Sequence, residues 1–443
     1  MVVRSVGSAE GRGRRRTRRA LAATVAAAAL FSVGACASSS TGASGSGDKV
    51  TLRLTWWGDE SRADFYQQAL DIFQSENPGV TVQTEYGSYA DYWTARNTEA
   101  AGKSLPDVFQ MDLPYLYQYA QFEQIQPLDA FVGKEITTDD VSQPLLKSGQ
   151  VDGKTYGIAS SASTMGLFVN TQLLDTLGVP VPEAGLTWDT LDAFLAQVSK
   201  AGASQNPQVY GSADYTQFFW LFQTWLAQQG KSLIQDGKLG FDKADLAAWW
   251  KRSAAGHASG AFLPAARYEQ LTGSGADDVG VGETAAAFSW DNNTVRYTAG
   301  SAHPTLSLLP LPADDLQGNS GIFQKPGLQM VMATNTKHPK ESAKLIDFLV
   351  NDPRVGKIFG MSRGIPASST ALGAVVPNDS DQKIIDFEKT VAPYLVDSPA
   401  PAPGLSVLEQ NFVTISSDVS YGTLSVDDAV NKWFDAATEA LKG

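Results

Sequence analysis

Aromatic side chains stand beside carboxylate or amide side chains at several places along this 443-residue chain. A pyranose ring presents apolar C–H faces that stack on indole or phenol rings, and its hydroxyl groups need polar partners such as carboxylates and amides. The groups of this kind are Trp57 with Asp59 and Glu60, Asp112 with Tyr115, and Trp290 with Asp291 and Asn293. Their composition favours a saccharide ligand over an amino acid or a metal ion.

Other classes of chemistry have few candidate residues. The three His residues and the single Cys are far apart in the sequence, so a zinc, haem or thiol centre has no obvious ligand set, and structural disulfides are excluded by count. The formal net charge is −13, although the first 35 residues are strongly basic. The remaining chain is therefore more acidic still, which argues against nucleic acid as a partner. We expect no cofactor and no metal.

The N-terminal region has the features of an export signal. Seven Arg residues precede an apolar stretch over residues 20–33, which is followed by Gly34, Ala35 and Cys36. A small residue before a Cys at this point is similar to the processing box of bacterial lipoproteins. We expect residues 1–35 to be a signal peptide, Cys36 to carry the lipid, and residues 36–47 to form a flexible linker, since they are rich in Ser, Gly and Ala.

The elements that must position the candidate residues follow from hydrophobic periodicity. The pattern predicts strands over residues 50–56, 80–84 and 106–112, with helical segments between them. Alternating strands and helices are typical of an α/β protein whose parallel sheet is covered by helices on both faces. Ligands of such sheets lie at the carboxyl ends of the strands, where the sequence places Trp57, Asp59, Tyr89, Asp112 and Tyr115.

Seven segments in a fixed order resemble the extracellular carbohydrate-binding lipoproteins of ABC transporters, the family of the maltodextrin-binding proteins. They are NPGVTV (77–82), LPDVFQMD (105–112), GKTYGI (153–158) leading to GLFVN (166–170), TWDTL (187–191), GETAAAFSW (282–290), HPKESAKLIDFL (338–349) and RGIPA (363–367). The resemblance covers nearly the whole chain after the linker. One departure is Ala286, where the family commonly has Met.

This resemblance implies a two-lobed clamp, each lobe a mostly parallel sheet flanked by helices, with the ligand cleft between the lobes. Lobe one would comprise residues 48–165 and 318–366, and lobe two residues 166–317 and 367–443. The implied function is extracytoplasmic binding of a mono- or oligosaccharide by hinge closure and delivery to ABC permease subunits. We expect a monomer without enzyme activity, held at the outer face of the cell membrane only by its lipid.

The resemblance also implies further ligand contacts. Trp220 falls where the family often has a stacking aromatic residue, Arg363 matches a position of a cleft Arg, and Gln329 marks the depth of the site. For the remaining Trp residues, packing in a hydrophobic core is a simpler interpretation than ligand binding. Trp56 continues the inward phase of its strand, and Trp433 lies on the apolar face of a C-terminal amphipathic helix.

Asp59 and Glu60 also have a structural interpretation, since they could merely complement the positive N-terminus of the helix that follows them.

Two alternatives from other functional classes stay open. A secreted glycoside hydrolase would need two facing carboxylates, for which Asp59, Glu60, Asp112 and Asp291 are candidates. A clamp for a peptide or polyamine would suit the acidic residues, although the aromatic and Asn content around Trp290 favours a sugar.

Overall fold

The computed structural model describes residues 49–442. Cys36, the expected signal peptide and the expected linker lie outside this range, so their predictions remain predictions. Within it, no helix is both long and apolar enough to cross a membrane.

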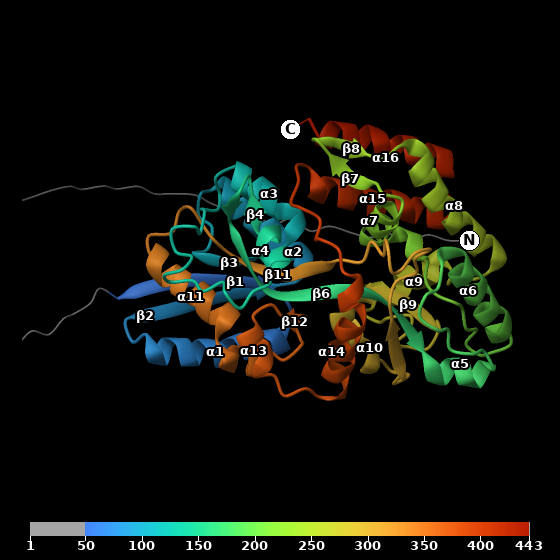
Figure 1. Cartoon of the computed structure of the whole chain (residues 1–443), viewed down its shortest axis with the longest axis horizontal. Helices are drawn as coiled ribbons and strands as arrows, with labels where there is room; N and C mark the ends of the chain where they lie inside the picture. The colour runs from blue at the N-terminus through green and yellow to red at the C-terminus, as the bar shows by residue number, and fades with distance from the viewer. Residues whose placement is uncertain (1–48, 443) are drawn as a thin grey trace, which may run out of the picture. The chain divides into compact units, whose positions relative to one another are not determined.

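The largest sheet has eight strands and is mixed in direction. Six of them follow the order β10-β6-β11-β3-β1-β2, and β9 and β12 also pair with β6 (Figure 1). The strands are β1 (Val50–Trp57), β2 (Val80–Gly87), β3 (Val108–Met111), β6 (Gly157–Asn170), β9 (Ala286–Trp290), β10 (Leu306–Leu309), β11 (Gln324–Met332) and β12 (Ile365–Pro366), and two small hairpins are formed by β4 (Gln150–Val151) with β5 (Lys154–Thr155) and by β7 (Ser232–Gln235) with β8 (Lys238–Gly240).

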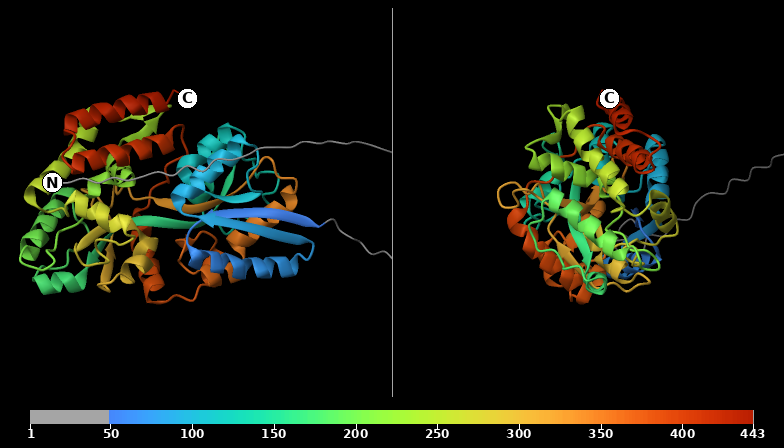
Figure 2. Two further views of the ribbon diagram at one scale, coloured as in Figure 1. Left: turned by 180° about the vertical axis from the view of Figure 1, so that it is seen from behind. Right: turned by 90° about the vertical axis from the view of Figure 1, so that its right-hand side faces the viewer.

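Helices occupy most of the remaining chain and pack on both sides of this sheet (Figures 1 and 2). They are α1 (Glu60–Glu76), α2 (Tyr89–Ala101), α3 (Leu113–Gln121), α4 (Gln143–Ser148), α5 (Thr171–Leu177), α6 (Trp188–Gly202), α7 (Phe219–Gln228), α8 (Lys243–Ser259), α9 (Ala265–Gly273), α10 (Thr294–Thr298), α11 (Pro339–Asn351), α12 (Pro353–Phe359), α13 (Ser369–Gly373), α14 (Asp379–Val391), α15 (Leu405–Ser420) and α16 (Val426–Ala440), with short 3₁₀ turns η1 (Tyr215–Gln217), η2 (Asp291–Asn293) and η3 (Ala392–Tyr394).

The α/β class expected from the sequence is confirmed, and so are its first three strands. β1 pairs in parallel with both β2 and β3, as the strand–helix–strand pattern predicts. All pairings of β6 and β11 are antiparallel, so the sheet as a whole is mixed and not mostly parallel. Periodicity shows that a segment is extended, but it does not show in which direction a later strand enters the sheet.

Strand β6 connects two groups of hydrophobic cores. All fourteen of its residues are buried. Its first half pairs with β11, and Ile158 and Ala162 join the core beneath β1 and β3. Its second half pairs with β9 and β10, and Met165 and Leu167 join the core of helices α6 to α8. We call the elements packed on the first group lobe one and those packed on the second group lobe two.

The core of lobe two includes the C-terminal helices α15 and α16 (Figure 2). Trp433 is completely buried there, and its indole N–H donates to the carbonyl of Leu408 at 3.3 Å. Trp249 and Trp250 are equally buried. Ser425 caps α16 as a hydroxyl acceptor. The packing interpretation of these Trp residues is therefore confirmed, as it is for Trp56 in lobe one, which is 2% exposed.

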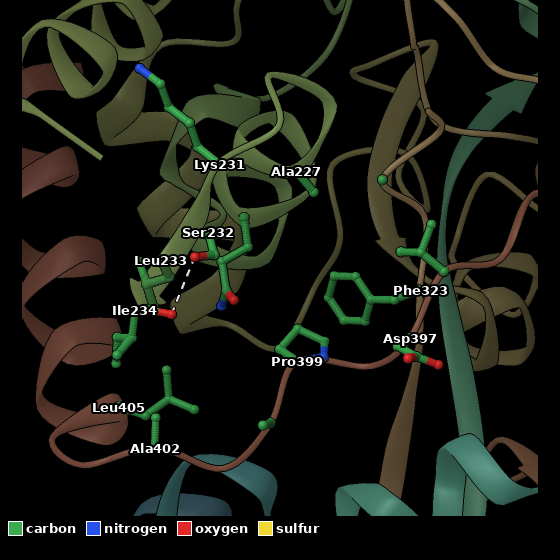
Figure 3. A pocket seen from close by; sticks show the side chains of 14 residues that line it. Ala227, Lys231, Ser232, Leu233, Ile234, Phe323, Asp397, Pro399, Ala402 and Leu405 are labelled. Atoms are coloured by element: carbon green, nitrogen blue, oxygen red, sulfur yellow. Dashed lines mark hydrogen bonds between the residues drawn. The ribbon is translucent and has the colours of Figure 1, made fainter. Parts of the chain in front are cut away.

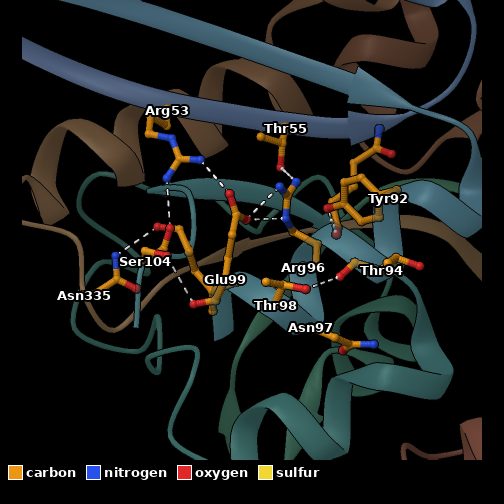
Figure 4. A network of polar contacts seen from close by, with 12 residues as sticks. Arg53, Thr55, Tyr92, Thr94, Arg96, Asn97, Thr98, Glu99, Ser104 and Asn335 are labelled. Carbon is orange, nitrogen blue, oxygen red and sulfur yellow. Dashed lines mark hydrogen bonds and ion pairs between the residues drawn. The ribbon is translucent and has the colours of Figure 1, made fainter. Parts of the chain in front are cut away.

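A partly buried charge network fastens α2 to the first strand of lobe one (Figure 4). Arg96 is almost completely buried and donates to Glu99 at 2.7 Å and to the hydroxyl of Thr55 at 2.6 Å. Arg53 reaches the other oxygen of Glu99, also at 2.7 Å. Because the carboxylate of Glu99 compensates both guanidinium groups, α2 is held in register with β1. This positions Tyr89, at the first turn of α2, near the carboxyl end of the sheet.

Candidate ligand-binding site

A buried ion pair lies where the two lobes meet. Asp112 directly follows β3 and caps α3, and one of its oxygens, Oδ1, accepts from the backbone N–H of Leu113 at 2.8 Å. The ammonium group of Lys325, on the second residue of β11, donates to the same oxygen at 2.7 Å. The side chains of Asp112 and Lys325 are only 12% and 11% exposed. The carboxyl end of a parallel strand therefore carries the acidic residue, as expected for an α/β sheet.

The other side of the Lys325 ammonium faces two indole rings of lobe two. It lies 4.8 Å from the ring centroid of Trp220 on α7 and 5.5 Å from that of Trp290 at the end of β9. The two indoles meet edge to face, and both contact Phe323. A cation over an indole face is attracted by the ring quadrupole. Lys325 thus links a carboxylate of lobe one to the aromatic surface of lobe two.

Glu409 on α15 completes the set of charges. Its carboxylate accepts from the indole N–H of Trp220 at 2.8 Å. Burial raises the pKa of Glu409 to about 7; nearby Lys325 opposes the increase, whereas the negative charge of Asp112 adds to it. A carboxyl group with this pKa is poised between its charged and neutral forms at neutral pH.

Lobe one contributes an aromatic wall on the opposite side of Asp112. The hydroxyl of Tyr89 donates to Asp112 Oδ2 at 3.0 Å, and the ring of Tyr115 stacks on that of Trp93 with centroids 3.7 Å apart. Trp57 meets Tyr89 edge to face at 5.5 Å. Enclosure of each hydroxyl and the nearby Asp112 carboxylate raise the pKa of both Tyr89 and Tyr115. These phenols therefore stay protonated and act as hydrogen-bond donors.

A groove of about 610 Å³ runs between α2 and α3 on one side and α15 on the other. Tyr115 borders both this groove and the charged cluster. The lining contains five amide side chains and two aromatic rings, with no charged residue among its members. These are Asn97, Ala100, Ala101, Tyr115, Gln118, Phe122, Gln124, Ser406, Val407, Gln410 and Asn411. Amides donate and accept hydrogen bonds, so the groove suits a ligand rich in hydroxyl groups.

A second cavity of about 380 Å³ lies within lobe two, between α7, β7 and the segment before α15 (Figure 3). Its walls are mainly apolar, and the ring of Phe323 points into it. Lys231, one of its two charged residues, is paired with Asp245 at 2.6 Å. This cavity offers few polar partners to a hydroxylated ligand, so we place the candidate site at the cluster around Lys325 and the groove beside it.

Comparison with known proteins identifies the family. The sequence profile of the bacterial extracellular solute-binding proteins matches residues 68–382, which is well over half of the chain. The chain belongs to this family. A protein of Brucella abortus strain 2308, named as a binding protein, is 22% identical over 307 residues, covering 64% of this chain and 68% of that protein. Membership establishes an extracellular protein that binds a solute, in keeping with the clamp expected from the sequence.

Solved structures of similar fold include two with saccharides. An oligogalacturonide-binding protein of Yersinia enterocolitica, in complex with digalacturonic acid, is 23% identical with a TM-score of 0.75 and covers 89% of this chain and 99% of its own. An ABC substrate-binding protein of Listeria monocytogenes, in complex with cycloalternan, is 17% identical with a TM-score of 0.75 and covers 89% of this chain and 100% of its own. At these identities the likeness shows the fold.

About half of the site residues predicted for this solute-binding protein come together in space. Asp112, Trp220 and Trp290 contact Lys325. Tyr89 binds Asp112, and Trp57 and Tyr115 adjoin Tyr89. Trp220 was expected as an aromatic residue on which the ligand stacks, but it is only 5% exposed and belongs to the core of lobe two. Truncating Trp220 would therefore leave a cavity in addition to removing an aromatic surface, so Trp290, which is partly exposed, is the cleaner site for a binding test.

Other predicted residues have structural roles at some distance from this cluster. Asp59 caps α1 and accepts from the hydroxyl of Ser61, and its pKa is lowered chiefly by the backbone N–H of Arg62. Glu60 is exposed in the first turn of the same helix, where an acidic side chain complements the helix N-terminus. This is the simpler of the two interpretations that the sequence left open for Asp59 and Glu60.

Arg363 and Gln329 lie inside lobe one. The guanidinium of Arg363 sits 3.7 Å above the ring of Phe359, and its burial lowers its pKa. Gln329 is completely buried, and its amide donates to the carbonyl of Ser148 at 3.4 Å. Neither side chain contacts the cluster around Lys325, because the side-chain partners of each lie in lobe one. The predicted ligand contacts at Arg363 and Gln329 therefore gain no support from the geometry.

Asp291 and Asn293 follow Trp290 but do not share its environment. Asn293 donates to the hydroxyl of Ser289 at 2.7 Å. Asp291 is completely buried, and its carboxyl lies beside the hydroxyl of Ser163 and the carboxyl of Glu388. Burial and the neighbouring carboxyl of Glu388, on α14, raise the pKa of Asp291 well above its usual range. The Oε2 atom of Glu388 accepts a hydrogen bond from the amide of Gln324 at 3.1 Å.

Sequence reasoning missed Lys325 and Glu409. Lys325 lies in residues 318–329, which resemble the family only loosely, and Glu409 is one of two acidic residues on α15. Trp93, which supports Tyr115, was also missed. A weak signal for Lys325 exists in the Pro and Gly that follow it, since both interrupt a regular strand and the register of β11 shifts there.

The buried state of Asp291 predicts a pH-dependent stability. Its pKa is higher in the folded chain than in the unfolded chain, so the folded state loses stability as pH rises from the usual carboxyl pKa through the raised value. Asp291→Asn cannot ionise, and its amide can donate to the unpartnered oxygen of Glu388. We expect the variant to be more stable than the wild type by a margin that grows as pH rises above the usual carboxyl pKa, measured by chemical denaturation at a series of pH values.

Asp386→Asn is the matched control, because Asp386 is exposed on the same helix as Glu388. The stability of this variant should depend on pH as that of the wild type does. Parallel profiles for Asp291→Asn and the wild type would contradict the assignment of a raised pKa to Asp291.

Proposed function

We propose that this protein binds a mono- or oligosaccharide outside the cytoplasm and delivers it to the permease of an ABC importer. The observation that carries the proposal is the cluster around Lys325, in which two indole rings and three charged side chains meet between the lobes. Indole and phenol faces bind the apolar faces of a pyranose, whereas Asp112, Lys325 and Glu409 offer acceptors and donors to its hydroxyl groups. The two saccharide-bound neighbours support a sugar of some kind.

Hinge closure is the second part of the proposal. Residues 48–165 with 318–366 would form one moving body and residues 166–317 with 367–443 the other. Support comes from β6, because its residues change from one group of cores to the other between Ala162 and Met165. The ligand-facing groups likewise come from both lobes, so a bound sugar would gain its full set of contacts only when the lobes close.

The third part concerns location. We propose a monomer tethered by a lipid on Cys36 to the outer face of the cell membrane, with residues 36–47 as the linker and residues 1–35 removed as a signal peptide. The sequence of the processing box supports this proposal. A tethered receptor would stay close to a permease in the same membrane.

A hydrolase is less well supported than a binding protein. Of the candidate carboxylates, Asp59 caps a helix, Glu60 is exposed beside it, and Asp291 is buried beside Glu388. Asp112 is engaged by Lys325. The amide-lined groove beside the cluster, whose lining has no charged residue, suits the hydroxyl groups of a saccharide better than a peptide or polyamine with several cations.

The first prediction from this proposal concerns Trp290. Trp290→Ala removes an aromatic face from the site, so we expect it to weaken saccharide binding by about 1 to 3 kcal/mol, roughly ten- to a hundredfold. The measurement is titration calorimetry with saccharides first selected by thermal shift from a carbohydrate panel.

Trp433→Ala is the control, since Trp433 lies in the core of lobe two. It should lower the melting temperature and leave the affinity of the folded protein nearly unchanged. The proposal would fail if Trp433→Ala reduced affinity while Trp290→Ala bound normally. Release of shorter sugars during the titration would instead indicate a hydrolase.

The second prediction concerns the anchor. If Cys36 carries the lipid, Cys36→Ser should release the protein from the membrane fraction into the medium, while its affinity for the selected saccharide stays the same. Immunoblots of the two fractions measure the release. Ala37→Ser is the control, because it changes a neighbouring residue and keeps the Cys. Wild-type membrane retention of Cys36→Ser would rule out lipid anchoring at this residue.

A further inference from the structure

We propose that Glu409 makes the site selective for uncharged saccharides by excluding sugars that carry a carboxylate, such as uronic acids. This inference rests on the proposed function and assigns the chemical class of the ligand. It follows from the number and pairing of the charges at the site.

Lys325 is not available to bind an acidic ligand. Its ammonium is already paired with Asp112 at 2.7 Å, and both side chains are largely buried. Turning Lys325 towards a ligand carboxylate would leave Asp112 buried without its cation, which is costly. The ion pair is therefore a neutral unit, and the hydroxyl of Tyr89 and the backbone N–H of Leu113 add donors to Asp112 without adding charge.

Glu409 is the remaining charge at the site. It makes no ion pair with any residue in the range 49–442. Its partner is the indole N–H of Trp220, which meets the partly exposed Trp290 edge to face, so the carboxylate lies beside the aromatic cluster at which a sugar would bind. A carboxylate on the ligand would meet a like charge there with little water between them to screen the repulsion. A hydroxyl group in the same place would donate a hydrogen bond to Glu409.

The adjoining groove offers no compensating cation. Its lining is made of amides, small residues and two aromatic rings, and none of these residues is charged. A chain of sugar units that extends from the cluster along α15 would thus meet hydrogen-bonding groups that suit hydroxyls. An acidic unit in the groove would lose hydration and gain no ion pair in return.

The ionisation of Glu409 supplies an internal test. The titratable and charged groups that face it are Asp112, Lys325, Tyr89 and Tyr115. Because the pKa of Glu409 is about 7, the group loses its charge as pH falls through neutrality, whereas a uronic acid stays ionised. Binding of an acidic sugar should therefore strengthen as pH falls, and binding of an uncharged sugar should change much less.

The experiment measures affinities for matched disaccharides by calorimetry on the wild-type protein. Each pair consists of a uronic acid disaccharide and the neutral disaccharide with a hydroxymethyl group in place of each carboxylate. At about pH 8.5 we expect the neutral member to bind at least about tenfold more tightly, and this ratio should shrink severalfold at about pH 5.5. The pH series needs no variant, so it tests the inference even if a substitution impairs folding.

Glu409→Gln keeps an acceptor for the Trp220 indole and removes the charge. We expect it to reduce the neutral-to-acidic ratio by about tenfold and to abolish the pH dependence of that ratio. Asp418→Asn is the matched control, because it removes one carboxylate from the surface of the same helix. It should leave the ratio and its pH dependence as in the wild type.

Two results would overturn the inference while sugar binding itself stands. One is a wild-type protein that binds the acidic member as tightly as the neutral member at about pH 8.5. The other is an unchanged ratio in folded Glu409→Gln. If no member of any pair binds to any form of the protein, the proposed function fails, and the inference falls with it.

Discussion

The ion pair between Asp112 and Lys325 is the interaction on which the candidate site depends. Two charges that are removed from water must be compensated locally, and here each compensates the other at 2.7 Å. The pair needs β3 and β11 to be neighbours in the sheet, since Asp112 follows one strand and Lys325 begins the other. The long connection through lobe two that separates these strands in the sequence thus ends beside the site that it helps to form.

The remaining features of the site follow from that pair. The ammonium group is satisfied on one side by the carboxylate and on the other by the faces of Trp220 and Trp290. The indole N–H of Trp220 then needs an acceptor, and Glu409 provides it. Burial raises the pKa of Glu409, and the negative charge of Asp112 adds to the increase. Glu409 makes no ion pair in residues 49–442, so its ionised form gives the site an acidic bias. A site with paired charges, aromatic faces and an amide-lined groove is suited to a ligand of many hydroxyls.

The sequence was sufficient for the local structure and for the lobe-one side of the site. Alternation of apolar residues located β1 and β2, and the rule that ligands bind at the carboxyl ends of strands selected Asp112 and Tyr115. It could not reveal that β6 and β11 run antiparallel, because strand direction is decided by the path of the chain through lobe two. Lys325 and Glu409 were missed for a related reason. A charged residue near a strand or on a helix becomes a site residue only when a distant segment packs against it.

Asp59 and Asp291 illustrate the opposite case, in which residues predicted for the site have structural roles. Both carboxylates stand close in sequence to a Trp of the aromatic clusters, yet one caps α1 and the other is enclosed beside Glu388. Neighbours in sequence at the end of a strand point in different directions, so a short polar group after an aromatic residue does not have to share its surface.

A crystal structure of the protein with a saccharide selected from a carbohydrate panel tests the central claim most directly. We expect a pyranose ring against the exposed face of Trp290, with hydroxyl groups in contact with Asp112 and Glu409 and further units along the groove beside α15. Electron density for the sugar in the apolar cavity between α7 and β7, or on an outer surface of one lobe, would contradict it.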